Sequence, residues 1–235
     1  MLLSLSLALA EPHDQMLTNA AGAPLHWATM PIRYTIDPTN TAGLAEAGVV
    51  AAIVEAAATW TSVEGAHAEY RFVGTERDAV GGYDDHNVVF FDDSWEVSPD
   101  LLAITSTWST EDGEILDFDM AVNTADHAWA LDGDAEVEDL QNTLTHEFGH
   151  ALGFGHDPAD IAATMFASAH PGELAKRDLT ESDEAVAIFA YSVEFPETEL
   201  DASESPSCST TSRGPGWALF ALVAPLLRRR RSELA

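Results

Sequence analysis

Three histidines and one glutamate stand at spacings that can bind a metal ion and perform hydrolysis. His146 begins the segment HEFGHALGFGH, in which His150 follows four residues later and His156 closes the segment. On a helix, side chains four residues apart project about 40° from each other, so both imidazoles can share one ion. Glu147 then lies beside the ion without ligating it. Gly153 can adopt a positive φ, and such a sharp turn would bring His156 back as the third ligand.

This ligand set predicts a particular chemistry. Three neutral imidazoles leave a zinc ion with an open position for water. The metal lowers the pKa of that water and polarises the scissile carbonyl group. Glu147 would accept the proton of the water and later deliver it to the leaving amine. The sequence therefore predicts one catalytic Zn²⁺, held by His146, His150 and His156, with Glu147 as the catalytic residue.

Apolar periodicity predicts the elements that must position these residues. Leu140, Leu144 and Phe148 fall on the face opposite the histidines, so the helix can bury one side and present the imidazoles on the other. The element order indicates one mixed α/β (α+β) domain. Expected strands cover residues 32–37, 68–73, 87–91, 101–108 and 115–122; expected helices cover residues 43–62, 138–153 and 180–191. The last helix follows a capping-box pattern, in which Thr180 precedes Asp183.

The amino-acid composition excludes several classes of protein. The chain has 235 residues, with 40 acidic against 10 basic residues and a formal net charge of -30. A nucleic-acid binder needs a basic surface, so nucleic acid is excluded as a partner. The single cysteine, Cys208, excludes an intramolecular disulfide framework and a cysteine-rich zinc site.

Both ends of the chain carry patterns typical of export. LLSLSLALA ends in an A-x-A-like cleavage site, although no Lys or Arg precedes it. Near the other end, the order is Cys208, a Gly/Pro break, the apolar run WALFALVAPLL and four arginines. We expect five segments: a signal peptide at 1–10, a lead-in at 11–24, the catalytic domain at 25–194, a Ser/Pro-rich acidic linker at 195–213, and an apolar tail with the arginines at 214–235.

The C-terminal order resembles the MYXO-CTERM type of sorting tail found on bacterial surface proteins. This resemblance implies that the region of Cys208 is the processing site and that the apolar helix is discarded. The alternative is an ordinary C-terminal anchor, although the apolar run has only eleven residues, against the ~20 that span a bilayer. Either interpretation places the protein outside the cytoplasm, at the cell surface or in the medium, with membrane contact only through the tail.

The central region resembles the metzincin metallopeptidases and, among them, the matrixins. Their pattern H-E-x-x-H-x-x-G-x-x-H is complete here, and Met165 lies nine residues after His156, close to the spacing of the family's methionine turn. GEILDFDMAVN is similar to the strand before the family's active-site helix, and LTESDEAVAIFAY to its closing helix. The resemblance implies a zincin-like fold with a twisted, mixed five-stranded sheet and three main helices, and Gly153 and Met165 as structural supports of the site.

The same resemblance implies how a substrate binds. An extended protein or peptide substrate would pair with the edge strand, for which residues 103–108 are the candidate. Residues 166–171 would form the wall of the S1′ pocket, and the protein would act as a monomer. The chain departs from the family at Asp157, where matrixins usually have Ser. The histidine-rich loop of a structural zinc site is not visible, and no cysteine switch precedes the domain.

Two alternatives remain open at this stage. Three acidic clusters could bind Ca²⁺ through oxygen ligands, although solvated loops are the simpler interpretation; they are Asp132 with Asp134 and Glu136, Asp92 with Asp93, and Asp112 with Glu114. The protein could also be a catalytically inactive binding or adhesion module on a metzincin fold. The intact Glu147 argues for an active enzyme. The other histidines are interpreted as surface or core residues: His26, His67, His86, His127 and His170.

Overall fold

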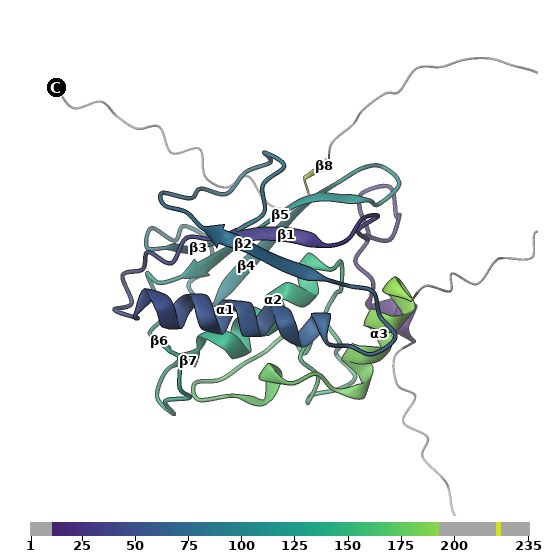
Figure 1. Ribbon diagram of the computed structural model, residues 1–235. Helices are drawn as coiled ribbons and strands as arrows, with labels where there is room; N and C mark the ends of the chain where they lie inside the picture. The colour runs from purple at the N-terminus through teal and green to yellow at the C-terminus, as the bar shows by residue number, and fades with distance from the viewer. Residues whose placement is uncertain (1–10, 193–219, 222–235) are drawn as a thin grey trace, which may run out of the picture.

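Five long strands form the main sheet, in the order β2-β1-β3-β5-β4, and the two-residue strand β8 adds to its β4 edge (Figure 1). The computed structural model describes residues 11–192 and 220–221. β1, β2, β3 and β5 run parallel, and β4 pairs antiparallel with β5 at one edge. The strands are β1 (Ile32–Ile36), β2 (Tyr70–Thr75), β3 (Val88–Asp92), β4 (Ala103–Ser109) and β5 (Ile115–Asn123). The predicted five-stranded mixed sheet is confirmed.

Three helices accompany the sheet, and α1 and α2 lie side by side along one of its faces (Figure 1). α1 begins three residues later than the periodicity predicts. Gly43 adopts a φ of 76° and the Asn40 side chain accepts a hydrogen bond from the Leu44 N–H, so these residues form a turn before the helix. The predicted capping box of α3 is present at Thr180 and Asp183. The helices are α1 (Glu46–Thr61), α2 (Leu140–Ala151) and α3 (Glu181–Tyr191).

The core lies between the helices and the sheet, and it fixes α2 in place. Phe148, on the face of α2 opposite the histidines, is fully buried and packs edge-on against the ring of Tyr70 at 4.8 Å between centroids. The Tyr70 hydroxyl also donates to the Phe148 carbonyl at 2.7 Å, and the Trp60 indole N–H donates to the Thr145 carbonyl at 2.7 Å. Because hydrogen bonds offset the cost of burying these polar groups, the side chains of Tyr70 and Trp60 can orient the helix from within the core.

Several short elements had no sequence signal strong enough to predict them. A small pair of parallel strands precedes α2. Two 3-10 helices also occur, one before β1 and one before α3. These are η1 (Pro12–Gln15), β6 (Trp129–Ala130), β7 (Glu138–Asp139) and η2 (Ala175–Arg177). Arg177 of η2 binds Asp139, the N-cap residue of α2, through two hydrogen bonds of 2.9 and 2.6 Å, which anchors the start of the helix.

The two ends of the chain fall mostly outside the described residues. The expected signal peptide at 1–10, the linker with Cys208 and nearly all of the apolar tail lie there. From the tail, only β8 (Phe220–Ala221) is described, and it pairs antiparallel with Trp108 and Ser109 at the end of β4. Within the described part of the chain, no helix has the length and apolarity needed to cross a bilayer.

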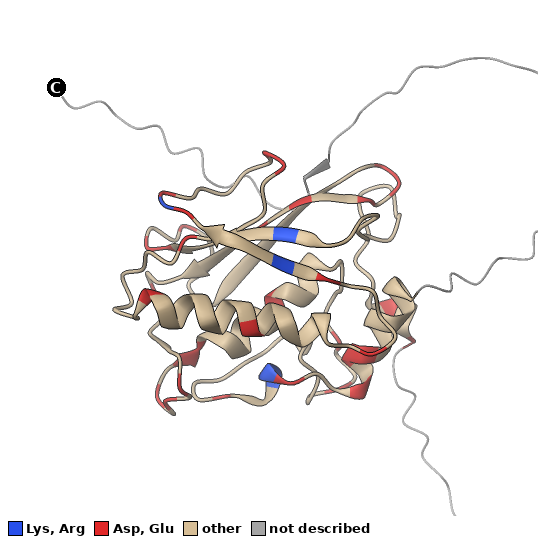
Figure 2. Ribbon diagram, in the orientation of Figure 1, with Lys and Arg blue, Asp and Glu red and all other residues tan. Residues whose placement is uncertain are grey.

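Charge is distributed very unevenly over the fold. Figure 2 shows acidic residues over helices and loops, whereas basic residues appear only on β1, β2, the β2–β3 loop and η2. The described basic residues are Arg33, Arg71, Arg77, Lys176 and Arg177. Most carboxylates of the domain therefore have no basic partner within reach.

Candidate active site

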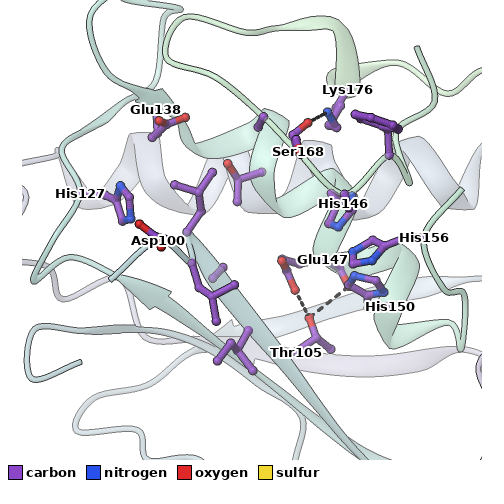
Figure 3. Close-up of a pocket in the computed structure, with 18 residues that line it drawn as sticks. Asp100, Thr105, His127, Glu138, His146, Glu147, His150, His156, Ser168 and Lys176 are labelled. Carbon is purple, nitrogen blue, oxygen red and sulfur yellow. Dashed lines mark hydrogen bonds between the residues drawn. The ribbon is translucent and has the colours of Figure 1, made fainter. Parts of the chain in front are cut away.

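The fold brings the three motif histidines together. His146 and His150 project from the same face of α2, and His156 returns to them from the turn that follows the helix (Figure 3). Ring centroids are 4.7 Å apart for His146 and His150, and 4.8 Å apart for His150 and His156. One ligand atom from each of the three lies within 4.8 Å of the others, and no other such group of His, Cys, Asp or Glu occurs among the described residues.

Backbone carbonyls orient two of these rings. His146 Nδ1 lies 2.7 Å from the Thr164 carbonyl oxygen, and His150 Nδ1 lies 2.7 Å from that of Phe154. A carbonyl can only accept, so each Nδ1 carries the proton and each Nε2 keeps its lone pair for a metal. Burial lowers the pKa of both histidines, which also favours the neutral, ligating form. The donor set and its tautomers therefore fit a three-histidine zinc site.

Gly153 makes the turn that returns His156. Its φ is 92°, and a Cβ at this position would meet the backbone carbonyl of Leu25. Only glycine satisfies both conditions without strain. The N-terminal segment holds the turn from outside, because the Leu17 N–H donates to the Gly153 carbonyl at 2.8 Å and the Gly155 N–H donates to the Gln15 carbonyl at 2.6 Å.

Met165 packs against α2 at Gly149, which lies between His146 and His150 on the chain. Its side chain is fully buried, and a Cβ on Gly149 would collide with its sulfur, so helix and methionine approach closely. The Asp157 N–H donates to the Met165 carbonyl at 2.9 Å. Asp157, where the family usually has Ser, is buried and accepts from the Gln15 amide at 3.2 Å, so here it joins the N-terminal segment to the site.

Asp183 supports the site from α3. Its carboxylate accepts hydrogen bonds from the N–H groups of Thr164 at 2.8 Å and Met165 at 3.0 Å, while also closing the capping box of α3. Thr164 is the residue whose carbonyl orients His146. A chain of hydrogen bonds thus runs from the start of α3 to a metal-ligand candidate. The capping pattern was visible in the sequence, but its reach to Thr164 was not.

Glu147 lies in the cleft beside the three histidines. It is only 7% exposed, and the Thr105 hydroxyl of β4 donates to its Oε2 at 2.6 Å (Figure 3). Burial raises the pKa of Glu147 to about 7, while the hydrogen bond from Thr105 acts in the opposite direction. A carboxylate with this pKa can both accept and release a proton near neutral pH. The role of Thr105 carried no sequence signal.

The cleft itself has a volume of about 530 Å³, within the usual range of ligand sites. Residues 103–105 of β4, together with residues 100–102 just before it, form one wall, and residues 166–169 form part of the other. Lys176 fixes this second wall, because its buried ammonium group donates to the Ser168 carbonyl at 2.6 Å. His170 and Pro171, which we expected in the wall, are exposed and are absent from its lining.

The end of the cleft away from His150 and His156 is polar. Asp100, His127 and Glu138 gather there (Figure 3). His127 thus lines the cleft, which the sequence did not indicate. Burial is the largest cause of a raised pKa at Glu138.

A comparison with known families identifies the family of the chain. The family model Peptidase_M10, Matrixin, matches residues 26–191. The chain is a matrixin. A search of curated proteins finds no match to it. The matched range spans the sheet, the three helices and every residue of the cluster described above, and the family assignment makes the matrixin domain a zinc metallopeptidase of the metzincin type.

Proposed function

We propose that this matrixin is an exported zinc endopeptidase that hydrolyses peptide bonds in extended protein or peptide segments. The observation that carries the proposal is the position of Glu147, whose buried carboxylate faces the same cleft as the three-histidine cluster. Retention of both the ligand set and the carboxylate favours an active enzyme over an inactive adhesion module.

Residues of this chain would bind the metal, bind the substrate and transfer the proton. His146, His150 and His156 would hold zinc, which when bound lowers the pKa of water and polarises a carbonyl group. β4 binds the substrate backbone along its edge near residues 103–105, which places the scissile bond beside Glu147. Glu147 accepts a proton from the attacking water and passes it to the leaving amine. Thr105 holds the carboxylate toward the cleft throughout.

The proposal is tested with the purified full chain and a peptide library. We expect cleavage that a transition-metal chelator abolishes and that added zinc restores, all in excess calcium so that only the histidine site is emptied. Absence of cleavage in zinc-loaded protein, or cleavage indifferent to the chelator, would contradict the proposal.

Thr105 offers a sharper test of the role of Glu147. Thr105→Val removes the hydroxyl at nearly constant volume, and a hydrogen bond to a charged group contributes about 1.5–3 kcal/mol. We therefore expect kcat to fall roughly 10- to 100-fold, with KM nearly unchanged. Because this hydrogen bond lowers the pKa of Glu147, its loss raises that pKa and moves the acidic limb of the pH–rate profile to higher pH.

Thr105→Ser is the matched control, since it keeps the hydroxyl and should keep the wild-type pH profile. A Val variant with a wild-type acidic limb would show that Thr105 does not position Glu147.

We also propose that the chain is exported and processed at its C-terminus near Cys208, so that residues 217–235 are absent from the mature protein. The order of Cys208, apolar run and arginines supports this proposal. Mass spectrometry of the protein extracted from the cell surface would measure the mature C-terminus. A chain ending at Ala235 would instead support a retained anchor.

A further inference from the structure

The cleft of the candidate active site is apolar along its sides and acidic at one end. Residues 101–104 supply apolar side chains on one side, and Phe166 with two alanines supplies them on the other. The carboxylates of Asp100 and Glu138 stand at the end opposite the histidine cluster (Figure 3). The proposed peptidase chemistry uses neither carboxylate.

Glu138 is held at this end by the strand pair that precedes α2. It pairs with Trp129 across β6 and β7, and its N–H donates to the Ala128 carbonyl at 3.1 Å. From Leu140, where α2 begins, to His146, the helix axis rises about 9 Å. Glu138 precedes this helix, so its distance from the histidines suits a long substrate side chain and not a short one.

The Glu138 carboxylate has no fixed partner. No hydrogen bond or ion pair within the described part of the chain engages its oxygens. Burial is the largest cause of its raised pKa, and the charge of Glu173 raises that pKa as well, whereas His127 and His170 lower it. A partly buried carboxylate of this kind is stabilised by a positive group that enters the cleft.

Thr143 offers a second polar group in the same cleft. It lies on α2 one turn before His146 and Glu147, on the helix face that carries the site. Thr143 is 5% exposed, and its Oγ1 is buried without a hydrogen-bond partner among the described residues. Buried hydroxyl groups are usually paired, because an unmade hydrogen bond is costly. A donor that enters the cleft beside Thr143 would supply the missing partner.

An anionic side chain finds no available positive group in this cleft. Lys176 is the one lysine or arginine among the described residues that line it, and its ammonium group already binds Glu173 at 2.8 Å and the Ser168 carbonyl at 2.6 Å. The start of α2 is also satisfied, because Asp139 Oδ1 accepts from the Asn142 N–H at 2.9 Å. The acidic end therefore favours a cation over an anion.

We propose that this cleft selects substrates with lysine or arginine directly after the scissile bond, and that Glu138, with Asp100 and Thr143, binds the positive charge. This proposal rests on the proposed peptidase function and names its substrate class. The side chain at this position, P1′, would enter between β4 and residues 166–169, where its methylene groups pack against the apolar sides. An uncharged side chain of the same length would leave the Glu138 carboxylate buried against an apolar group.

The first test uses the zinc-loaded full chain and fluorogenic peptides that differ only at P1′, with lysine, arginine, norleucine or glutamate there. Norleucine has the aliphatic stem of lysine without the charge. We expect kcat/KM for the two basic peptides to exceed that for norleucine by about 10- to 100-fold, the range of a hydrogen bond to a charged group, and glutamate to be slowest. Mass spectrometry of the products identifies the bond that is cut.

Glu138→Gln keeps the size of the side chain and removes its charge. The preference for lysine over norleucine should fall about 10-fold, whereas a purely structural defect would slow both peptides equally. Glu136→Gln is the matched control, since Glu136 is exposed and lies two residues away, outside the cleft lining. This control should keep the wild-type preference.

Peptide binding distinguishes this proposal from the proposed function. Zinc-loaded Glu147→Ala should bind peptides without cleaving them, so titration gives Kd values that do not depend on the reaction. The lysine peptide should bind about 10-fold more tightly than the norleucine peptide. If the wild type cleaves no peptide but this order of Kd values holds, the peptidase function is refuted and the selectivity is supported.

Three results would overturn the proposal. The first is a wild-type chain that cleaves or binds the norleucine peptide as well as the lysine peptide. The second is a preference for lysine at another position and not at P1′. The third is an undiminished lysine preference in Glu138→Gln. The peptide series needs no variant, so it decides the selectivity even if Glu138→Gln fails to fold, and Asp100→Asn, at an exposed position, then tests the acidic end.

Discussion

Glu147→Ala is expected to retain zinc and fold while losing peptide cleavage by about 10²–10⁴-fold, the usual contribution of a general acid–base group. The three histidines and their backbone partners are untouched by this change. What is lost is the proton transfer between the attacking water and the leaving amine. Cleavage rates measured on one peptide, with zinc content determined on the same samples, provide the test.

Glu147→Gln serves as the matched variant, because the amide keeps the size of the side chain and can still accept from Thr105. It should be as inactive as the alanine variant, since an amide cannot take up the proton. Near-wild-type cleavage by either variant at full zinc occupancy would show that another group is the base.

Replacing a histidine of α2 should abolish zinc binding itself. His146→Ala or His150→Ala leaves two imidazoles, which cannot hold the ion as three do. We expect zinc content to fall from about one equivalent to a trace after gel filtration, and cleavage to disappear with it. Elemental analysis of the wild type and both variants gives the result directly.

His127→Ala is the control for this experiment, because His127 lines the same cleft but stands outside the three-histidine cluster. It should retain zinc. A His150→Ala chain that keeps stoichiometric zinc would assign the ion to other ligands, and a wild type without zinc after supplementation would refute the site altogether.

Much of this site follows from local sequence. Spacing along a helix is fixed by geometry, so His146 and His150 had to share a face once the apolar positions indicated a helix. The glycine at position 153 indicated the turn after the helix, and the alternation of apolar and polar residues indicated strand β5. Helix and strand limits came within about three residues because apolar periodicity is a local signal.

The residues that support the site act through contacts between distant parts of the chain, which local sequence patterns do not predict. Thr105 is 42 residues from Glu147, and nothing in a strand of small polar residues distinguishes it from Ser106. Asp183 carried a capping signal, yet the pattern contains no information about the Thr164 turn 19 residues away.

The hydrogen bonds at the C-terminal end of α2 bear on when the active site can form during folding. The Trp27 indole donates to the Ala151 carbonyl at 2.7 Å, and the Tyr191 hydroxyl donates to the Leu152 carbonyl at 2.7 Å, so both ends of the domain satisfy the last turn before Gly153. A chain that is still being synthesised can already carry all three histidines while it lacks Tyr191. The N-terminal segment can already hold the turn that leads to His156, but the hydrogen bond to the Leu152 carbonyl forms only when α3 docks. We therefore expect peptide cleavage to develop only after α3 has folded onto the rest of the domain.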